Sequence, residues 1–555
     1  MPDSEQLTVP PADAPSPAAA DPYSDDLVLV EAVRRHGAEQ HAGRLRDLAE
    51  VAGSPRSAKW AEFVDRYPPT LRTHDAHGER IDEVEYHPAW HRLLQAGMRG
   101  GLAATAWAQD HTAQPHTARA AALLIWSQTE LSHVTALSST YAVAPALGAN
   151  ESLAAEWLPR LASRTYESAL RPVTDKLGAT AGLAVTERAG GTDLRATTTV
   201  ARPEDGGGSP SSAYRLTGHK WFVSAPMSDA FLVLAQAPGG LTTFLVPRVL
   251  PDGRRNPWRL QRLKPTLGTR ALGVAEVELD NSWGVRVGDE GRGLRTLAVA
   301  TTSLRRDGVV SAAGLMRTCV VRAVRHARGR RVFGSALVDK PLMQNVLADL
   351  AVESEAATLL ALRLAAAVDA GEQDLLRVAV PVAKYWVGKR VPMVAAEALE
   401  CLGGNGYVEE HGLARVFRAA VLPSLWEGPG NVTALDVLRA MSLQPRAMEV
   451  LLGEIDRARG ADPRLDRAMD DVAAFLQAAA REARRDPAAV EAGARWMVER
   501  LAIALQASLV VRCSPSVVST AYLATRVAGA GGFLAGTLPV GRRTTEAIVE
   551  RALPA

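Results

Sequence analysis

Three long segments of helical periodicity follow one another in the second half of the chain, and they restrict its fold more than any other feature. Apolar residues recur at helical spacing over residues 294–330, 341–370 and 372–402. The connections between these segments are short, so neighbouring helices should run antiparallel and pack along their length. A shorter helical pattern follows Glu427. The sequence therefore predicts a four-helix bundle domain at residues 291–443.

Between residues 183 and 290 the pattern changes from helical to alternating. Short apolar runs such as Phe231–Leu234, Phe244–Val246 and Val274–Leu279 are separated by clusters of Gly, Pro, Asp and Ser. Parallel strands need crossover helices, and no helical segment lies between these runs. The prediction is an antiparallel barrel or sandwich of about six or seven strands.

Helical patterns also flank these two domains. Residues 26–182 predict an N-terminal helical domain, and residues 444–555 predict an additional helical region. Residues 1–25 are rich in Pro, Ala, Asp and Ser, which cannot bury enough apolar surface to offset chain entropy, so they predict a disordered tail. The fold class is α+β.

Charge and cysteine usage exclude several classes of protein. Across 555 residues, 63 Lys plus Arg nearly balance 61 Asp plus Glu, so no global field collects nucleic acid or an anionic membrane. Cys319, Cys401 and Cys513 lie far apart without CxxC spacing, which predicts neither disulfides nor zinc and fits a reducing compartment. No run approaches the roughly twenty apolar residues of a membrane span. We expect a cytoplasmic protein without a membrane partner.

A group of histidines, His74, His77, His87 and His91, is the one candidate for a metal site. His87 and His91 have the i, i+4 spacing of helical metal ligands. No glutamate of the HExxH type stands between them, and Pro88 follows the first. We therefore expect hydrogen-bonded or exposed histidines and no metal.

Glu427 is the candidate for general base chemistry. It stands between Trp426 and Gly428, just before a helical pattern. An apolar neighbour raises a carboxylate pKa towards working pH, and glycine allows a ligand to approach the backbone. The alternative is a glutamate that serves only the helix dipole.

Two stretches of the β domain carry groups suited to a flat heterocycle. Val185-Thr-Glu-Arg-Ala-Gly-Gly-Thr-Asp-Leu194 places glycines and hydroxyls in a loop, and Gly218-His-Lys-Trp-Phe-Val-Ser224 places an aromatic ring beside a hydroxyl. An ordinary turn and the end of a core strand are the structural alternatives. Together with the helical domains and Leu425-Trp-Glu-Gly428, their order resembles the acyl-CoA dehydrogenase superfamily of flavoproteins over residues 80–440.

The resemblance implies FAD as cofactor, an acyl-CoA substrate and a likeness to the TEPxAGSD and KxWIT motifs. Flavin contacts would then fall to Val185, Thr186, Thr192, Phe222 and Ser224. Arg188, Thr192 and Ser224 depart from the commoner residues of these motifs.

Further cofactor contacts are implied across a subunit interface. Arg330-Arg-Val-Phe-Gly334 matches RxxFG, whose arginine reaches the pyrophosphate of a neighbouring subunit, with Phe333 beside it. Gln344, Gly403 and Gly404 resemble the elements that hold the adenosine end. A homotetramer is the expectation. Without the resemblance, the position of Arg330 in the bundle predicts only a solvent-exposed charge.

In the family, the position of Glu427 holds the base that removes the α-proton while hydride leaves the β-carbon. The alternative position, near Leu304 and Arg305, carries no carboxylate, and Asp307 is expected off the required helical face. No motif specifies the electron acceptor.

Segments including Gly78–Trp90, Phe222–Asp229 and Ser424–Asn431 resemble the alkylation-response branch of the superfamily. That branch is associated with protection of DNA against alkylation, with binding of double-stranded DNA and with weak activity on isovaleryl-CoA, so a short or branched acyl chain is expected. Residues 441–555 hold 15 Arg and no Lys against 13 Asp plus Glu, clustered at Arg481, Arg484, Arg485, Arg542 and Arg543. For the arginine clusters, the alternative is that they are solvated helix faces. For the function, the alternatives are a DNA-binding flavoprotein in which dehydrogenation is vestigial and an acyl-CoA oxidase.

Overall fold

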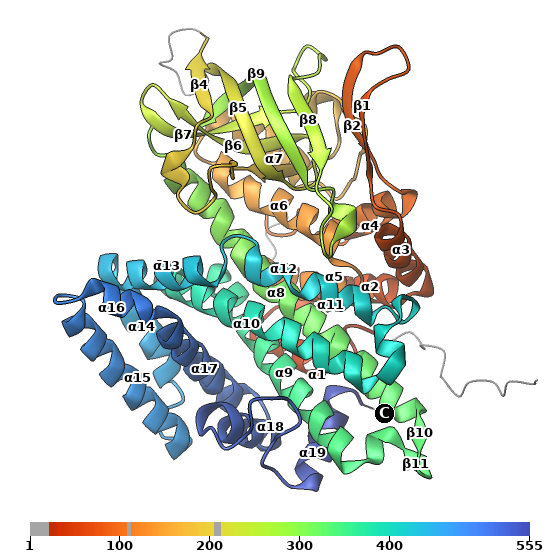
Figure 1. The fold of residues 1–555 in the computed structure, drawn as a ribbon, viewed down its shortest axis with the longest axis vertical. Helices are drawn as coiled ribbons and strands as arrows, with labels where there is room; N and C mark the ends of the chain where they lie inside the picture. The colour runs from red at the N-terminus through yellow and green to blue at the C-terminus, as the bar shows by residue number, and fades with distance from the viewer. Residues whose placement is uncertain (1–20, 108–112, 205–211, 555) are drawn as a thin grey trace, which may run out of the picture.

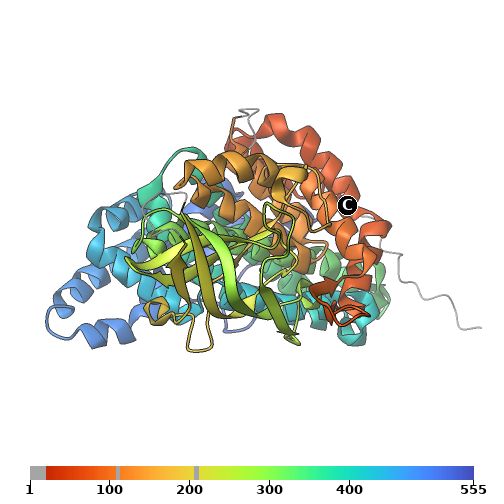
Figure 2. The same cartoon turned by 90° about the horizontal axis from the view of Figure 1, so that it is seen from above.

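The computed structural model describes residues 21–107, 113–204 and 212–554. A barrel of strands lies above a bundle of long helices, and the remaining C-terminal helices lie beside the bundle (Figure 1). Seen from above, the first helices (red) and the light-blue helices that follow residue 445 lie on opposite sides of the molecule (Figure 2). Residues 1–20 of the predicted disordered tail lie outside the described residues. Residues 21–25 form a turn in which Tyr23 is buried, so the ordered chain begins before residue 26.

The N-terminal domain is helical, and its helices begin where the sequence supplies caps. Asp26 accepts a hydrogen bond from the backbone N–H of Leu29, and Asn150 does the same for Leu153, each at 3.1 Å. The helices are α1 (Leu27–Arg35), α2 (Ala42–Gly53), α3 (Pro55–Arg66), α4 (Pro88–Arg99), α5 (Pro115–Ser127), α6 (Leu131–Leu147) and α7 (Glu151–Leu161).

A β-hairpin interrupts this domain, and the sequence pattern did not predict it. Strands β1 (Thr70–His74) and β2 (Arg80–Glu85) pair antiparallel. Their side chains are largely exposed or half-buried, so the apolar alternation that marks a strand is weak. The Asp82 carboxylate accepts a hydrogen bond from the backbone N–H of Leu260 at 2.9 Å, so the hairpin joins the N-terminal domain to the barrel.

The middle domain is a seven-stranded sheet that closes on itself. Its strands are β3 (Ala181–Ala184), β4 (Val200–Pro203), β5 (Ala213–Val223), β6 (Ala230–Ala237), β7 (Gly240–Pro247), β8 (Trp258–Leu263) and β9 (Ala275–Val287). Pairing runs from β6 through β7, β9, β5 and β4 back to β6. Most pairs are antiparallel, as predicted, but β3 pairs parallel with β6, and β4 meets β6 in a single parallel bridge. The long chain between β3 and β6 allows this direction without a crossover helix, which the sequence argument did not consider.

The bundle is built from the predicted long helices, whose ends differ from the prediction by one residue at most. They are α8 (Gly293–Gly329), α9 (Pro341–Asp369) and α10 (Gln373–Cys401), with α11 (Leu413–Ala420), α12 (Leu422–Leu425) and α13 (Gly430–Leu443) completing the domain. A two-residue turn between β10 (Arg331–Val332) and β11 (Ser335–Ala336) separates α8 from α9.

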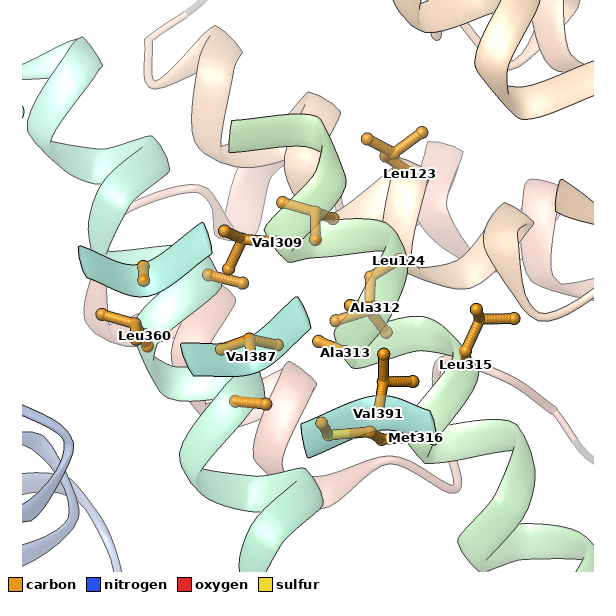
Figure 3. Packing of buried hydrophobic residues seen from close by; sticks show 14 of the residues in the cluster. Leu123, Leu124, Val309, Ala312, Ala313, Leu315, Met316, Leu360, Val387 and Val391 are labelled. Atoms are coloured by element: carbon orange, nitrogen blue, oxygen red, sulfur yellow. The ribbon is translucent and has the colours of Figure 1, made fainter. Parts of the chain in front are cut away.

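Helix α8 runs through the middle of the bundle. Ala312, Leu315 and Met316 on α8 are buried with Leu124 of α5 and Val391 of α10 (Figure 3). Small residues on α8 permit close approach: a side chain at Gly314 would lie 2.7 Å from the carbonyl oxygen of Leu124. This packing holds α8 rigidly beneath the barrel.

The additional C-terminal region is helical, as predicted, and returns to the bundle. It contains α14 (Pro445–Asp456), α15 (Pro463–Glu482), α16 (Pro487–Ala492), α17 (Ala494–Cys513), α18 (Ser516–Tyr522) and α19 (Arg542–Ala552). Arg551 of α19 forms ion pairs with Glu31 of α1 at 2.7 Å and Glu355 of α9 at 3.1 Å. The two ends of the described chain therefore meet on α9.

Candidate active site

Glu427 lies in the turn between α12 and α13 with a backbone conformation rare for a residue with a side chain. Its φ is +55° and that of Gly428 is +102°. The left-handed conformation costs a non-glycine residue roughly 1–2 kcal/mol. Strain of this kind persists where surrounding structure holds it, and such places are often functional sites.

Glycines let this turn lie directly on α10. A side chain at Gly388 of α10 would meet the carbonyl oxygen of Pro423 at 3.0 Å, and one at Gly430 would meet the Tyr385 ring at 3.3 Å. The turn therefore packs on α10 at backbone distance.

Two cations bind the backbone of the turn. Arg305 of α8 donates from Nε to the carbonyl oxygen of Glu427 at 3.0 Å. Lys384 of α10, a buried residue, donates from Nζ to the carbonyl oxygen of Gly428. Asp436 of α13 accepts from Arg305 at 2.6 Å and from Arg377 at 3.0 Å. Residues from three helices thus fix the turn.

The electrostatics of the turn suit a general base. Burial raises the pKa of Glu427 to about 6, although Arg305 and Lys384 oppose the rise. Burial lowers the pKa of Lys384 to about 7, with Arg305 adding to the effect and Glu427 opposing it. At neutral pH the Glu427 carboxylate is ionised and still a competent proton acceptor.

An apolar wall stands next to this carboxylate. Trp426 and Leu183 of β3 both pack against a buried cluster that includes Val143 of α6 and Leu304 of α8. Leu183 lies two residues before Val185, so the wall connects the Glu427 turn to the first of the two stretches predicted to hold the heterocycle.

A buried ion pair holds those two stretches together, and the sequence analysis did not single it out. Lys220 of β5 donates from Nζ to Glu187 at 2.8 Å, with both side chains almost fully buried. Glu187 also accepts from the hydroxyls of Thr198 and Thr199, each at 2.6 Å. Burial raises the pKa of Glu187, but Lys220 and these hydroxyls lower it to about 2. Only the occurrence of both residues within the quoted motifs hinted at this pair.

The predicted flavin contacts in the barrel lie at one rim. Val185 and Thr186 follow β3, and the backbone N–H of Trp221 donates to the Thr186 carbonyl at 2.8 Å. Phe222, next to Trp221, is 52% exposed, and Ser224 lies in the turn that follows. Thr192 is exposed in the loop after β3.

The other predicted cofactor residues lie at the opposite end of the bundle. Arg330 ends α8, Phe333 forms the exposed hairpin tip, Gln344 lies in the first turns of α9, and Gly403 and Gly404 follow α10. Along α8, 25 residues separate Arg305 from Arg330, which is roughly 37 Å at 1.5 Å per residue. One chain therefore does not bring this group to its own Glu427 turn.

Asp307 is engaged elsewhere. Its carboxylate binds Arg119 of α5 through two bonds of 2.6 and 2.7 Å, and Arg119 lies over the Tyr141 ring. Two of the four candidate histidines are also engaged: His87 caps α4, and His91 bonds the Tyr166 hydroxyl at 2.8 Å. In the described parts of the chain, no group of three or more side chains is arranged to hold a metal.

None of the described helices is long and apolar enough to cross a membrane.

The predicted arginine clusters are exposed but separate. Arg481, Arg484 and Arg485 lie at the end of α15, next to α16, and Arg542 and Arg543 begin α19. Figure 1 shows α16 and α19 at different ends of the C-terminal region. Arg542 pairs with Glu546 at 2.8 Å.

Comparisons with known proteins agree with this architecture. Residues 13–168 match the adaptive response protein AidB N-terminal domain, residues 182–282 match the acyl-CoA dehydrogenase middle domain, and residues 291–442 match the acyl-CoA dehydrogenase C-terminal domain. Fold and site together define a flavoprotein oxidoreductase of the acyl-CoA dehydrogenase type.

The relatives specify the branch. AidB of Escherichia coli strain K12 is 39% identical over 472 residues, covering 84% of this chain and 86% of AidB. The chain belongs to the AidB branch of the acyl-CoA dehydrogenase family, and its cofactor is FAD. The structure of Caenorhabditis elegans ACDH-11 in complex with C11-CoA aligns with a TM-score of 0.80 and 25% identity, covering 97% of this chain and 91% of the other. An acyl-CoA dehydrogenase of Bacillus anthracis complexed with FAD aligns with a TM-score of 0.62 and 17% identity, covering 84% and 81%.

The residues present fit FAD. The half-exposed Phe222 ring follows Trp221, whose backbone N–H binds the Thr186 carbonyl in the polar loop after β3, so an apolar ring and polar groups are available near one another for a planar heterocycle. At the other end of the bundle, Gln344 Oε1 is buried without a hydrogen-bond partner among the described residues. Side chains at Gly403 or Gly404 would extend into open space, so nothing in the described chain fills that position.

Proposed function

We propose that this protein catalyses the α,β-dehydrogenation of an acyl-CoA thioester with Glu427 as the base that removes the α-proton. The observation that carries this proposal is the Glu427 turn: a carboxylate with a pKa of about 6, set against an apolar wall and fixed by side chains from three helices. FAD, when bound, accepts the hydride that leaves the β-carbon.

The protein's own residues place the substrate and move the proton. The half-buried Trp426 gives the acyl chain an apolar surface, and the buried Val143 and Leu304, in the cluster against which Trp426 packs, exclude water behind it. The ionised Glu427 takes the α-proton, and its high pKa makes that transfer favourable near neutral pH. Val185, Thr186, Thr192, Phe222 and Ser224 hold the flavin ring at the barrel rim.

Arg330, Phe333, Gln344, Gly403 and Gly404 bind the pyrophosphate and adenosine of a cofactor in another copy of the chain. The length of α8 supports this assignment, because it keeps these residues roughly 37 Å from the chain's own Glu427 turn. Large apolar side chains are also exposed there: Phe333 is 98% and Tyr407 is 90% accessible. A homotetramer completes four such sites.

The acyl chain is the finer part of the proposal. C11-CoA bound to the related ACDH-11 supports acyl-CoA as the substrate class. Reduction of the bound flavin under anaerobic conditions, with thioesters from isovaleryl-CoA to C11-CoA, ranks the chains directly. Oxygen uptake with release of hydrogen peroxide would identify an acyl-CoA oxidase instead.

Glu427→Gln is the decisive variant. It should retain FAD but lose flavin reduction by acyl-CoA by about 10³-fold or more, because the amide keeps the shape and does not accept a proton. Glu449→Gln, on an exposed position of α14, is the matched control and should behave as wild type. Wild-type reduction in Glu427→Gln would remove the proposed mechanism.

Association with double-stranded DNA is a second proposed function, supported by the exposed arginines of α15 and α19. Residues 317–331, at the end of α8, are also rich in arginine, but they are less available to DNA. Arg317 is buried and binds Asp26 and the carbonyl oxygen of Ala552, and Arg328 pairs with Glu550. Any DNA contact should therefore be made to phosphates by the separate clusters of α15 and α19.

A further inference from the structure

Two cationic side chains bind the Glu427 turn, and the proposed reaction gives neither of them a chemical step. Arg305 reaches it from α8 and Lys384 from α10, and their contacts fall on adjacent carbonyl oxygens, those of Glu427 and Gly428. These residues lie 122 and 44 positions from their partners in the chain. Such contacts restrain the backbone where it takes its left-handed conformation.

We propose that Arg305 and Lys384 are positioning residues for the catalytic base: they hold the left-handed Glu427 turn by its carbonyl oxygens and so keep positive charge near the Glu427 side chain. This inference rests on the proposed role of Glu427 and deepens it. Neither side chain is assigned contact with the substrate.

The arrangement around Arg305 supports a positioning role. Asp436 of α13 holds the Arg305 guanidinium at 2.6 Å, and Arg377 of α10 holds Asp436 at 3.0 Å. Arg305 and Asp436 are 14% and 16% exposed, so solvent screens them weakly. The guanidinium therefore has a fixed direction before any ligand arrives.

Lys384 is the more unusual of the two. Its ammonium is buried and bound to a backbone carbonyl, where an apolar residue would pack at lower cost. The charged groups that face the turn are Arg305 from α8, Lys384 and Lys389 from α10, and Glu427 itself. Glu427 is the group in this set that favours a charged lysine.

The proposal predicts in which direction the pH profile of flavin reduction shifts and which variant shifts it further. Removing either cation leaves the ionised Glu427 carboxylate less stabilised. The acid limb in the pH profile of flavin reduction should therefore move to higher pH. Arg305 opposes the raised pKa of Glu427 more than Lys384 does, so Arg305→Met should move the limb further than Lys384→Met. We expect a shift of about 1 pH unit or more for Arg305→Met, and flavin reduction at pH 6 that is about fivefold slower or more. Arg305→Lys and Lys384→Arg should restore most of the wild-type profile.

The test measures acyl-CoA-driven flavin reduction from pH 5 to 9 in wild type, these variants, Glu427→Gln and the control Arg295→Met. Arg295 is an exposed arginine on the same helix, α8. A limb that stays at the wild-type position in Arg305→Met and Lys384→Met, while Glu427→Gln is inactive, overturns the positioning role alone. Activity in Glu427→Gln overturns the proposed function instead.

Hydrogen exchange of residues 423–431, followed by mass spectrometry on the FAD-loaded protein without substrate, tests the restraint independently. Arg305→Met should increase exchange in this segment several-fold and leave the barrel unchanged, and Arg295→Met should match wild type. Unchanged exchange in both Arg305→Met and Lys384→Met would show that other contacts hold the turn.

Discussion

Lys220→Met should separate the two stretches that we propose hold the flavin. Lys220 on β5 and Glu187 after β3 form an ion pair of 2.8 Å with side-chain exposures of 0% and 2%. Methionine keeps much of the volume and removes the charge, so Glu187 is left as a buried carboxylate without its cation. Removing one partner of a buried pair costs about 3–5 kcal/mol.

The lower end of that range applies here because Glu187 keeps other partners. Two backbone N–H groups and two hydroxyls, from Thr198 and Thr199, still donate to it. We therefore expect a loss of about 3 kcal/mol in unfolding free energy. With a urea dependence of about 1–3 kcal/mol per molar, the midpoint of flavin release should fall by about 1–3 M.

The contribution of this ion pair to the unfolding free energy depends on pH in a direction set by the pKa of Glu187. The folded-state pKa of Glu187 is about 2, below its ordinary value of 4.5, so the pair stabilises the protein above pH 4.5 and the contribution disappears as the pH falls towards 2. Urea titrations at pH 7 and pH 4, monitored by flavin fluorescence, measure the loss of unfolding free energy, and the difference between wild type and Lys220→Met should be smaller at pH 4. The double variant Glu187→Gln with Lys220→Met should be less destabilised than the two single variants added together. Full stability and full FAD content in Lys220→Met would refute the argument.

Three further predictions follow from the site and the surface. In the wild-type protein, flavin reduction by acyl-CoA should rise with pH through an acid limb near 6, because the pKa of Glu427 is raised to about 6 and only its ionised form accepts the proton; a limb below pH 5 in stopped-flow traces would contradict this. Arg330→Glu should lose FAD through repulsion of the pyrophosphate, while Arg331→Glu, also exposed and adjacent in the chain, should retain it, as absorbance at 450 nm against protein will show. Duplex DNA binding should weaken with a log–log salt slope of about −4 to −5 if about five phosphates are contacted, and charge reversal of Arg484 with Arg485, or of Arg542 with Arg543, should each flatten that slope in anisotropy titrations without changing FAD content.

Local signals in the sequence determined the element types and the long helices of the bundle. Helical periodicity over about 30 residues is a strong pattern, and Pro341 at the start of α9 and Gly371 after its end mark its limits, so the predicted ends agree within one residue. The motifs around Glu427 and the two barrel stretches were also recognisable, because each lies within a few consecutive residues. The weakly patterned β1–β2 hairpin and the strand β8 were missed.

Tertiary structure decided which of these residues meet. Arg305 and Glu427 are 122 residues apart, and Lys220 and Glu187 are 33 apart. The parallel pairing of β3 with β6, and the distance along α8 that sends Arg330 away from its own Glu427, likewise depend on how the whole chain packs. The physical reason is that a one-dimensional pattern records which face of an element is apolar. The partner of a buried charge is chosen only when separate elements come together and exclude water between them.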